Sequence, residues 1–403
     1  MLWEQQNNPN FKGFEFDPLL KEAGSNAFTT SLTGWVELTN AVGIVPLCEK
    51  RNGKIRKESQ SPIYNYEKIS NFVNTYIIRY LTNEQQDIYP ADLKTIMAKA
   101  KPFIKWVGGK TQLIEQLDAQ LPADFGNWEN VTYIEPFIGG GAMLFYMLQR
   151  YPNIQRAVIN DVNSDLTTCY RTVRDFPEQL IASLQDIQDS YYALQTEEAR
   201  KEFFLAVRER YNEKNLEPIE NTTKFFFLNR TCFNGLYRVN KKGLFNVPFG
   251  KYANPQICDP MTIRKDSEIL QRVEIMTGDF EATFGHAEGN TLFYFDPPYR
   301  PLSDTSSFND YTKEAFNDDA QIRLKNYCER INDAGFKFML SNSDCKGKNE
   351  ADNFFDVLYQ AFQIERVWAS RSINSNPNKR GKLTEILVHN YEDTKATAHV
   401  DIF

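Results

Sequence analysis

Apolar runs and polar segments alternate along residues 101–391 in a way that predicts strands and helices in turn. A helical pattern over 141–151 follows the first strand-like run, and a longer one covers 189–213. Strands that alternate with helices are typical of an α/β domain with a mainly parallel sheet. The predicted strands lie at 130–137, 156–161, 291–296, 337–342 and 384–390.

The chain divides into three parts by the texture of its sequence. Its 403 residues are enough for two or three domains. Residues 1–97 combine a strand-like stretch at 28–47 with a helical pattern at 66–81, and we expect a small N-terminal extension domain of unknown role. The α/β pattern of 98–165 and 271–403 predicts one core domain, interrupted by a mainly helical insertion at 166–270.

The stretch LFYFDPPYR at 292–300 presents Asp296 at the end of a predicted strand. Pro297 and Pro298 cannot extend a strand, because they lack a backbone donor and fix φ, and Tyr299 adds a ring directly behind them. Ligands of open α/β sheets bind at the carboxyl ends of strands, so the position favours a functional acid. An isolated Asp-Pro step is also an ordinary turn, which leaves a structural alternative open.

Two further predicted strands end in groups suited to a nucleotide-like ligand. YIEPFIGGGAMLF (133–145) joins a strand to a helix through three glycines, which let backbone approach a ligand closely. About twenty residues on, Asp161 in NDVNSDL ends the next strand, where an acid can accept from ribose hydroxyls. The glycines match neither GxGxxG nor a phosphate-binding loop, which disfavours a dehydrogenase or nucleotide hydrolase. KWVGGKTQL (105–113) and GDF (278–280) add weaker signals.

Charge is distributed unevenly along this acidic chain. The net charge of −7 argues against a general polyanion binder. Residues 221–258, however, contain six Lys or Arg and no Asp or Glu, and 366–382 contain five and none. These segments could hold a nucleic acid on one face, or could simply be solvated surface.

Cysteine and histidine usage excludes several kinds of chemistry. The six cysteines show no CxxC spacing, so neither a zinc site nor a disulfide framework is predicted. The three histidines lie outside the distinctive segments, which makes Ser-His or Cys-His catalysis improbable. We see no signal peptide and no apolar run near the roughly 18 residues of a membrane span, and therefore expect a cytoplasmic protein.

Six segments in one order carry a family resemblance: KWVGGK, EPFIGGGA, NDVNSDL, NRTCFNGLYRVNKKGLFNVPFGKY, FDPPY and RSINSN. With them, residues 101–391 resemble the Dam family (alpha group, D12 class) of adenine-specific DNA methyltransferases, which use S-adenosylmethionine. The resemblance implies a Rossmann-like class I methyltransferase sheet with an inserted, mainly helical target-recognition domain that bears a β-hairpin. The core domain would then be catalytic, and 166–270 the recognition domain.

The resemblance also assigns the catalytic and cofactor residues. Adenine's exocyclic amine is a poor nucleophile, and the Asp296 carboxylate and Pro297 carbonyl would accept its two hydrogens and orient its lone pair. Tyr299, held by Pro298, would stack on the target base after it is flipped out of the duplex. The implied contacts to S-adenosylmethionine are Trp106, Lys110, Glu135, Phe137, Gly139, Gly141, Asp161, Asp279, Phe280 and Asp296.

The recognition segment implies a GATC site. Arg238, before a hairpin-like VNKKGLFNVP, would donate two hydrogen bonds to a guanine, while Pro248 would meet a thymine methyl. Lys105 would contact the first guanine and Phe233, where many relatives have tyrosine, would insert near the flipped base. The expected DNA contacts are Lys105, Arg230, Phe233, Asn234, Gly235, Leu236, Arg238, Asn240, Pro248 and Arg371.

The expected partners are double-stranded DNA and a cognate restriction endonuclease, with no membrane, for a monomer in the cytoplasm or nucleoid of a bacterium or in a phage-infected cell. Alternative hypotheses are an amino-group methyltransferase that acts on another site, on cytosine, on RNA or on a protein amide, and a catalytically inactive DNA-binding protein. A nicotinamide-dependent dehydrogenase is the third.

Overall fold

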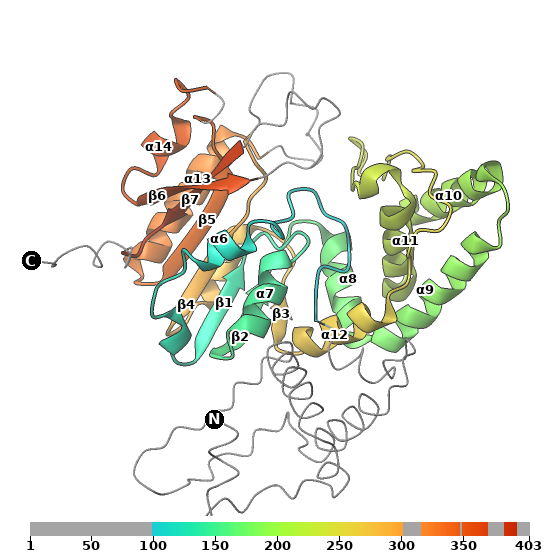
Figure 1. Ribbon diagram of the computed structural model, residues 1–403, viewed down its shortest axis with the longest axis horizontal. Coiled ribbons are helices and arrows are strands. Elements are labelled where there is room, and N and C mark those ends of the chain that lie inside the picture. The colour runs from blue at the N-terminus through green and yellow to red at the C-terminus, as the bar shows by residue number, and fades with distance from the viewer. Residues whose placement is uncertain (1–98, 301–315, 347–348, 370–382, 393–403) are drawn as a thin grey trace, which may run out of the picture. The chain divides into compact units, whose positions relative to one another are not determined.

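A seven-stranded sheet in the order β3-β2-β1-β4-β5-β7-β6 organises the described part of the chain (Figure 1). The computed structural model describes residues 99–300, 316–346, 349–369 and 383–392. Strands β1 to β5 are parallel, whereas β7 runs antiparallel to both of its neighbours. The strands are β1 Val131–Glu135, β2 Ile154–Ile159, β3 Val273–Ile275, β4 Thr291–Phe295, β5 Lys337–Ser343, β6 Gln363–Ala369 and β7 Leu383–His389.

The central strands are apolar because both faces of the sheet are covered. Every residue of β1 and β4 is buried, as expected for strands between two helical layers. Alternate residues serve the two sides: Tyr133 and Tyr294 belong to one core, and Ile134 and Phe293 to the other.

Helices cover these two cores. Helices α7, α8, α11 and α12 contribute to the first core, and α13 and α14 to the second. The helices are α6 Ile114–Asp118, α7 Ala142–Arg150, α8 Ser164–Asp175, α9 Pro177–Tyr192, α10 Glu197–Asn212, α11 Pro218–Thr231, α12 Pro260–Leu270, α13 Asp318–Asp333 and α14 Phe354–Leu358, with 3-10 turns at Phe125–Asn127, Phe233–Gly235 and Phe280–His286.

The predicted α/β class is confirmed, and all five predicted strands occur with small shifts of their ends. The prediction of one continuous helix over 189–213 was wrong. Helix α9 ends at Tyr192 and α10 begins at Glu197, because the Thr196 side chain caps α10 by accepting from the Ala199 amide at 3.1 Å.

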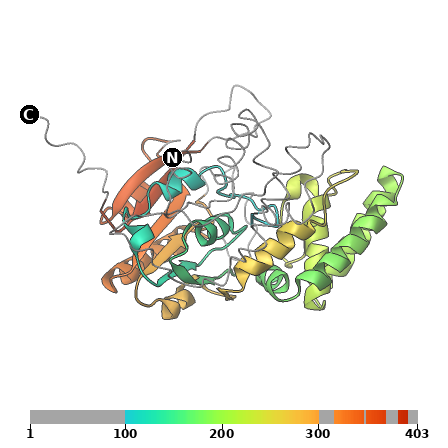
Figure 2. The same cartoon turned by 60° about the horizontal axis from the view of Figure 1, so that its bottom comes forward.

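The helices of the predicted insertion gather to one side of the sheet, as two views show (Figures 1 and 2). There α11 packs on α8, α9 and α10, and α12 packs on α8 and α9. The division into core and recognition domain remains a prediction. Residues 1–97 and Arg371 lie outside the described residues. No helix in the described ranges is both long and apolar enough to cross a membrane.

The parallel arrangement brings three acids to one edge of the sheet. Glu135 ends β1, Asp161 follows β2 and Asp296 follows β4, and these strands are neighbours. Because carboxyl ends of adjacent parallel strands meet at the same edge, that edge is where a site is expected.

Gly141, directly before α7, tests how tightly this edge is built. Its φ is +72°, and an added Cβ would lie 2.4 Å from the hydroxyl oxygen of buried Tyr170. We expect Gly141→Ala to lower the free energy of unfolding in urea by about 2–5 kcal/mol, from left-handed backbone strain together with overpacking. Gly108→Ala is the matched control, because φ there is +82° but no heavy atom lies within 4 Å of the added Cβ. It should lose only about 1–2 kcal/mol; equal losses would contradict the steric argument.

Candidate active site

A buried lysine ammonium lies at the end of β4. The Lys110 side chain is only 4% exposed, and its Nζ donates to Asp296 Oδ1 at 2.7 Å, to the Gly108 carbonyl at 3.3 Å and to the Tyr299 hydroxyl. An ammonium has three donors, so these contacts use its full capacity. Lys110, expected from the sequence only as a cofactor contact, thus forms a direct ion pair with the strand-end acid.

The DPPY turn is fixed by side chains from other elements. The Tyr299 hydroxyl donates to Glu385 Oε2 of β7 at 2.7 Å. The Pro298 carbonyl accepts from Gln321 Nε2 of α13 at 3.2 Å. Among the described residues no donor contacts the Pro297 carbonyl.

Opposing effects act on the Asp296 carboxyl. Burial raises its pKa, while the Lys110 ammonium at 2.7 Å favours the ionised form. Burial is the larger effect, so the pKa of Asp296 stays above its ordinary value, and the lysine limits the rise. The ion pair thus favours the form of Asp296 that accepts hydrogen bonds.

The glycine loop after β1 lies against Trp106 and Asp161. A Cβ added at Gly139 would lie 3.0 Å from Trp106 Cδ1, and one added at Gly140 would lie 3.1 Å from Trp106 Cβ, so only glycine allows this approach. The Gly139 amide donates to Asp161 Oδ2 at 3.3 Å, and the Asn163 amide donates to Oδ1 at 2.9 Å. Burial nevertheless raises the pKa of Asp161 to about 6, with both amides opposing the shift.

Glu135 is a second buried acid at this edge. It is 2% exposed and accepts from the Tyr133 hydroxyl at 2.7 Å, and no basic side chain among the described residues forms an ion pair with it. Burial raises its pKa to about 8; the tyrosine hydrogen bond opposes the shift and the nearby Asp296 charge adds to it. The acid is thus suited to a cationic ligand.

Phe137, which follows β1, and Phe280, which follows β3, form an aromatic pair. The Phe137 and Phe280 rings are 5.2 Å apart, and Phe280 is almost fully buried. Asp279 caps the 3-10 turn by accepting from the Glu281 amide and forms an ion pair with Arg323, so its carboxylate is already engaged.

A buried asparagine joins Lys105 to the turn after α11. Asn229 Oδ1 accepts from the Lys105 amide at 2.8 Å, while its Nδ2 donates to the Lys105 and Gly235 carbonyls, both at 2.9 Å. Gly235 has a φ of +65°, and an added Cβ would lie 2.4 Å from Lys105 Cδ. The predicted DNA-contacting residues Lys105 and Gly235 therefore lie in contact, with Lys105 exposed and Gly235 buried.

The expected hairpin is a short antiparallel turn. Val239 pairs with Phe245, and Asn240 organises the turn by accepting from the Lys242 and Leu244 amides. The Arg238 guanidinium donates through Nε to Asn246 Oδ1 at 2.6 Å and through Nη2 to the Asn246 carbonyl at 3.1 Å. These two bonds fix the direction of the Arg238 side chain.

The other predicted DNA-contacting residues differ in exposure. Phe233 is 52% exposed, Pro248 is exposed, and Asn234, which follows Phe233, is exposed with a φ of +55°. Leu236 is half-buried. The Arg230 guanidinium instead donates inward to the Phe103 carbonyl at 2.7 Å and is mostly buried.

Sequence reasoning missed three residues that hold these groups: Glu385, Asn229 and Asn246. Asn229 and Asn246 lie inside the segment that carried the family resemblance. Nothing in a single sequence, however, distinguishes an asparagine that joins two segments by hydrogen bonds from one on the surface. Glu385 lies in a predicted strand, TEILVHN, where an acid among apolar residues was the available signal.

Comparisons with known proteins identify the family and several relatives of this chain. The family model of the D12 class N6 adenine-specific DNA methyltransferases matches residues 106–373. The chain is similar to the type II methyltransferase M.MjaIII of Methanocaldococcus jannaschii, with 44% identity over 73% of this chain and 100% of that protein. It is 40% identical to the type II methyltransferase M1.LlaDCHI of Lactococcus lactis over 72% and 95%, and 31% identical to a DNA adenine methylase of Vibrio cholerae over 72% and 96%.

The raised pKa of Glu135 predicts a pH dependence of folding. An acid that keeps its proton longer when folded stabilises the fold below its unfolded pKa, near 4.5, and that stability is lost as pH rises towards 8. In Glu135→Gln, which keeps an acceptor for Tyr133, the free energy of unfolding should fall less between pH 5 and 8, by on the order of a few kcal/mol. Urea unfolding across this range measures it, and parallel pH curves for the two proteins would contradict the assignment.

Proposed function

The chain belongs to the D12 class of N6 adenine-specific DNA methyltransferases, and from this premise we propose that it transfers a methyl group from S-adenosylmethionine to the exocyclic amine of adenine in duplex GATC, after that base is flipped out. The observation that carries the proposal is the cluster at the end of β4. There Asp296 is paired with buried Lys110, beside Tyr299 and a Pro297 carbonyl that no described donor contacts.

The residues at the strand ends fit S-adenosylmethionine. Trp106 lies so close to the loop at Gly139 and Gly140 that an added Cβ at Gly139 would come within 3.0 Å of its ring. Asp161 offers a carboxylate suited to ribose hydroxyls, and Glu135 is a buried acid suited to a cationic group. Phe137 and Phe280 provide apolar rings for an adenine. When bound, this cofactor supplies an electrophilic methyl group on a positively charged sulfur.

Asp296 and Pro297 act on the target amine. The Asp296 carboxylate accepts one amine hydrogen and the rigid Pro297 carbonyl accepts the other, which favours a tetrahedral nitrogen with its lone pair directed at the methyl group. Lys110 favours the ionised form of Asp296. The methylated nitrogen then loses a proton, for which the Asp296 carboxylate is the nearest base in this arrangement.

Stacking holds the flipped base. An adenine within a duplex cannot reach Asp296, so it leaves the stack and lies against the Tyr299 ring. The half-exposed Phe233 ring, on the turn that Asn229 joins to Lys105, enters the space beside it.

Recognition of GATC rests on the hairpin surface. Arg238 is directed by Asn246 and donates to a guanine edge, Lys105 contacts the other guanine, and exposed Pro248 meets a thymine methyl. Leu236, Asn234 and Asn240 shape this surface. Arg230 also belongs to the proposed DNA-contacting set, and its guanidinium donates to the Phe103 carbonyl. Arg371 contacts phosphates.

Two of the similar proteins are named type II methyltransferases, which favours a role beside a restriction endonuclease that cuts the same site. We place the activity in a monomer on double-stranded DNA. Resistance of the methylated site to such a nuclease would be its biological consequence.

The proposal predicts labelling of one duplex and not another. Labelled methyl from S-adenosylmethionine should enter a duplex with a single GATC but not one with GTTC. Asp296→Asn keeps the shape of the side chain but removes its charge, and should lower kcat by about a hundredfold or more while duplex affinity in a gel shift changes less than about threefold. Equal label on both duplexes would refute the site, and full activity of the variant would refute the mechanism.

Arg238 carries a separate prediction. Arg238→Ala should reduce discrimination against substitution of its guanine by about 1–3 kcal/mol in kcat/KM. Lys242→Ala is the control, because this exposed turn lysine should weaken binding to all duplexes uniformly. Unchanged selectivity of the arginine variant among single-base variants of the site would remove Arg238 from the readout.

A further inference from the structure

The hydroxyl of Tyr299 has one hydrogen, and the structure shows where it must point. Lys110 is an ammonium, which only donates, so the tyrosine oxygen accepts from it and its own hydrogen must be donated elsewhere. The acceptor is Glu385 Oε2 at 2.7 Å, and the same oxygen lies 3.7 Å from Lys110 Nζ. The result is a directed chain from ammonium through hydroxyl to carboxylate.

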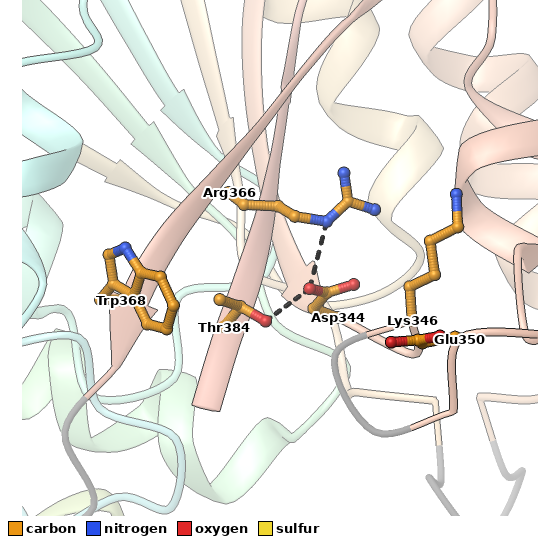
Figure 3. A pocket seen from close by; sticks show the side chains of 6 residues that line it. All are labelled: Asp344, Lys346, Glu350, Arg366, Trp368 and Thr384. Atoms are coloured by element: carbon orange, nitrogen blue, oxygen red, sulfur yellow. Dashed lines mark hydrogen bonds and ion pairs between the residues drawn. The ribbon is translucent and has the colours of Figure 1, made fainter. Parts of the chain in front are cut away.

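Glu385 lies 86 residues after Tyr299 in the chain, on a different strand from the one that ends at the DPPY turn. It lies on β7, whose register pairs it with Ser343 of β5 on one side and Val367 of β6 on the other. Because successive strand residues face opposite sides, its neighbour Thr384 points away from Tyr299. Figure 3 shows Thr384 and Arg366 converging on Asp344.

The hydrogen bonds of Asp344 to Arg366 and Thr384 hold β7 in place. Asp344 is 4% exposed and follows β5, so its bonds to Arg366 of β6 and Thr384 of β7 tie all three strands together. Arg366 is itself held by Asp356 at 2.8 Å. The Glu385 carboxylate is thereby presented at a fixed position, 15% exposed, on the catalytic side.

A tyrosine ring needs such an anchor if it is to stack on a base. Its two rotatable bonds leave the ring several orientations, and a hydrogen bond to a charged acceptor selects one of them. The ring also has the Lys110 ammonium 4.5 Å from its centroid, so a change of its orientation would disturb the partner of Asp296.

We propose that Glu385 is a positioning residue of the methyl transfer, which acts by fixing the ring of Tyr299. This inference rests on the proposed function, because it concerns how the target adenine is held. It assigns no contact between Glu385 and the base. It makes the C-terminal β6–β7 hairpin part of the catalytic apparatus.

The first experiment compares kinetics of variants on the GATC duplex. Glu385→Leu removes the acceptor at similar size, Glu385→Gln restores an acceptor, and Glu365→Leu removes a glutamate from the neighbouring strand that makes no ion pair among the described residues. We expect kcat to fall about ten- to hundredfold in Glu385→Leu, with KM for DNA changed less than about threefold, partial recovery in the glutamine variant, and no change in Glu365→Leu.

A double variant tests whether Glu385 acts through the tyrosine. Tyr299→Phe keeps the ring but removes the hydroxyl, so adding Glu385→Leu to it should lower kcat by no more than about twofold further. Full activity of Glu385→Leu, multiplicative effects in the double variant, or an equal loss in Glu365→Leu would overturn the proposal.

The orientation of the ring is also measurable without turnover. In protein labelled with 3-fluorotyrosine, the ¹⁹F resonance absent from Tyr299→Phe identifies residue 299. It should shift or broaden in Glu385→Leu and stay in place in Glu365→Leu; an unmoved resonance in Glu385→Leu would overturn the positioning role. If the wild-type protein labels no duplex, the proposed function fails, whereas the resonance still decides whether Glu385 fixes the ring.

Discussion

A buried ammonium group is the constraint on which the candidate active site depends. Taking the Lys110 charge out of water is costly unless it is paired and its three hydrogens are accepted. Asp296, Tyr299 and the Gly108 carbonyl accept them, and Glu385 adds a second carboxylate 3.7 Å from the ammonium nitrogen. Loss of any of these partners would leave a buried charge partly uncompensated. The four groups are therefore held together by electrostatics as much as by the backbone that carries them.

The short segment 105–110 extends this constraint to the rest of the site. At its start, the backbone of Lys105 is hydrogen-bonded to Asn229, which also binds the Gly235 carbonyl. Trp106 lies against the glycine loop. Lys110 at its end meets Asp296. Six consecutive residues thus touch the recognition turn, the loop after β1 and the end of β4. A shift of this segment would move all three together.

Local signals made part of this predictable. Asp161 and Asp296 were found because each directly follows an apolar strand, and parallel strands bring such ends together. Glu385 and Asn229 were not, because their contacts join residues 86 and 124 positions apart, which no local pattern encodes. Strand β6 was missed because Gln363–Ala369 mixes charged and apolar residues, as edge strands do. Arg371 and the N-terminal 97 residues lie outside the described ranges.

The two unpaired acids show how the site departs from what folding alone would select. Burial raises the pKa of Glu135 to about 8 and of Asp161 to about 6, so each reduces stability once ionised. A core built only for stability would place apolar side chains there, whereas acids at the carboxyl ends of adjacent strands make sense if a polar ligand supplies the missing partners. Asp296 differs because it has an ion-pair partner in Lys110. The edge therefore holds one acid paired with a lysine and two acids without an ion-pair partner in the described part of the chain, which fits the proposed transfer between two substrates.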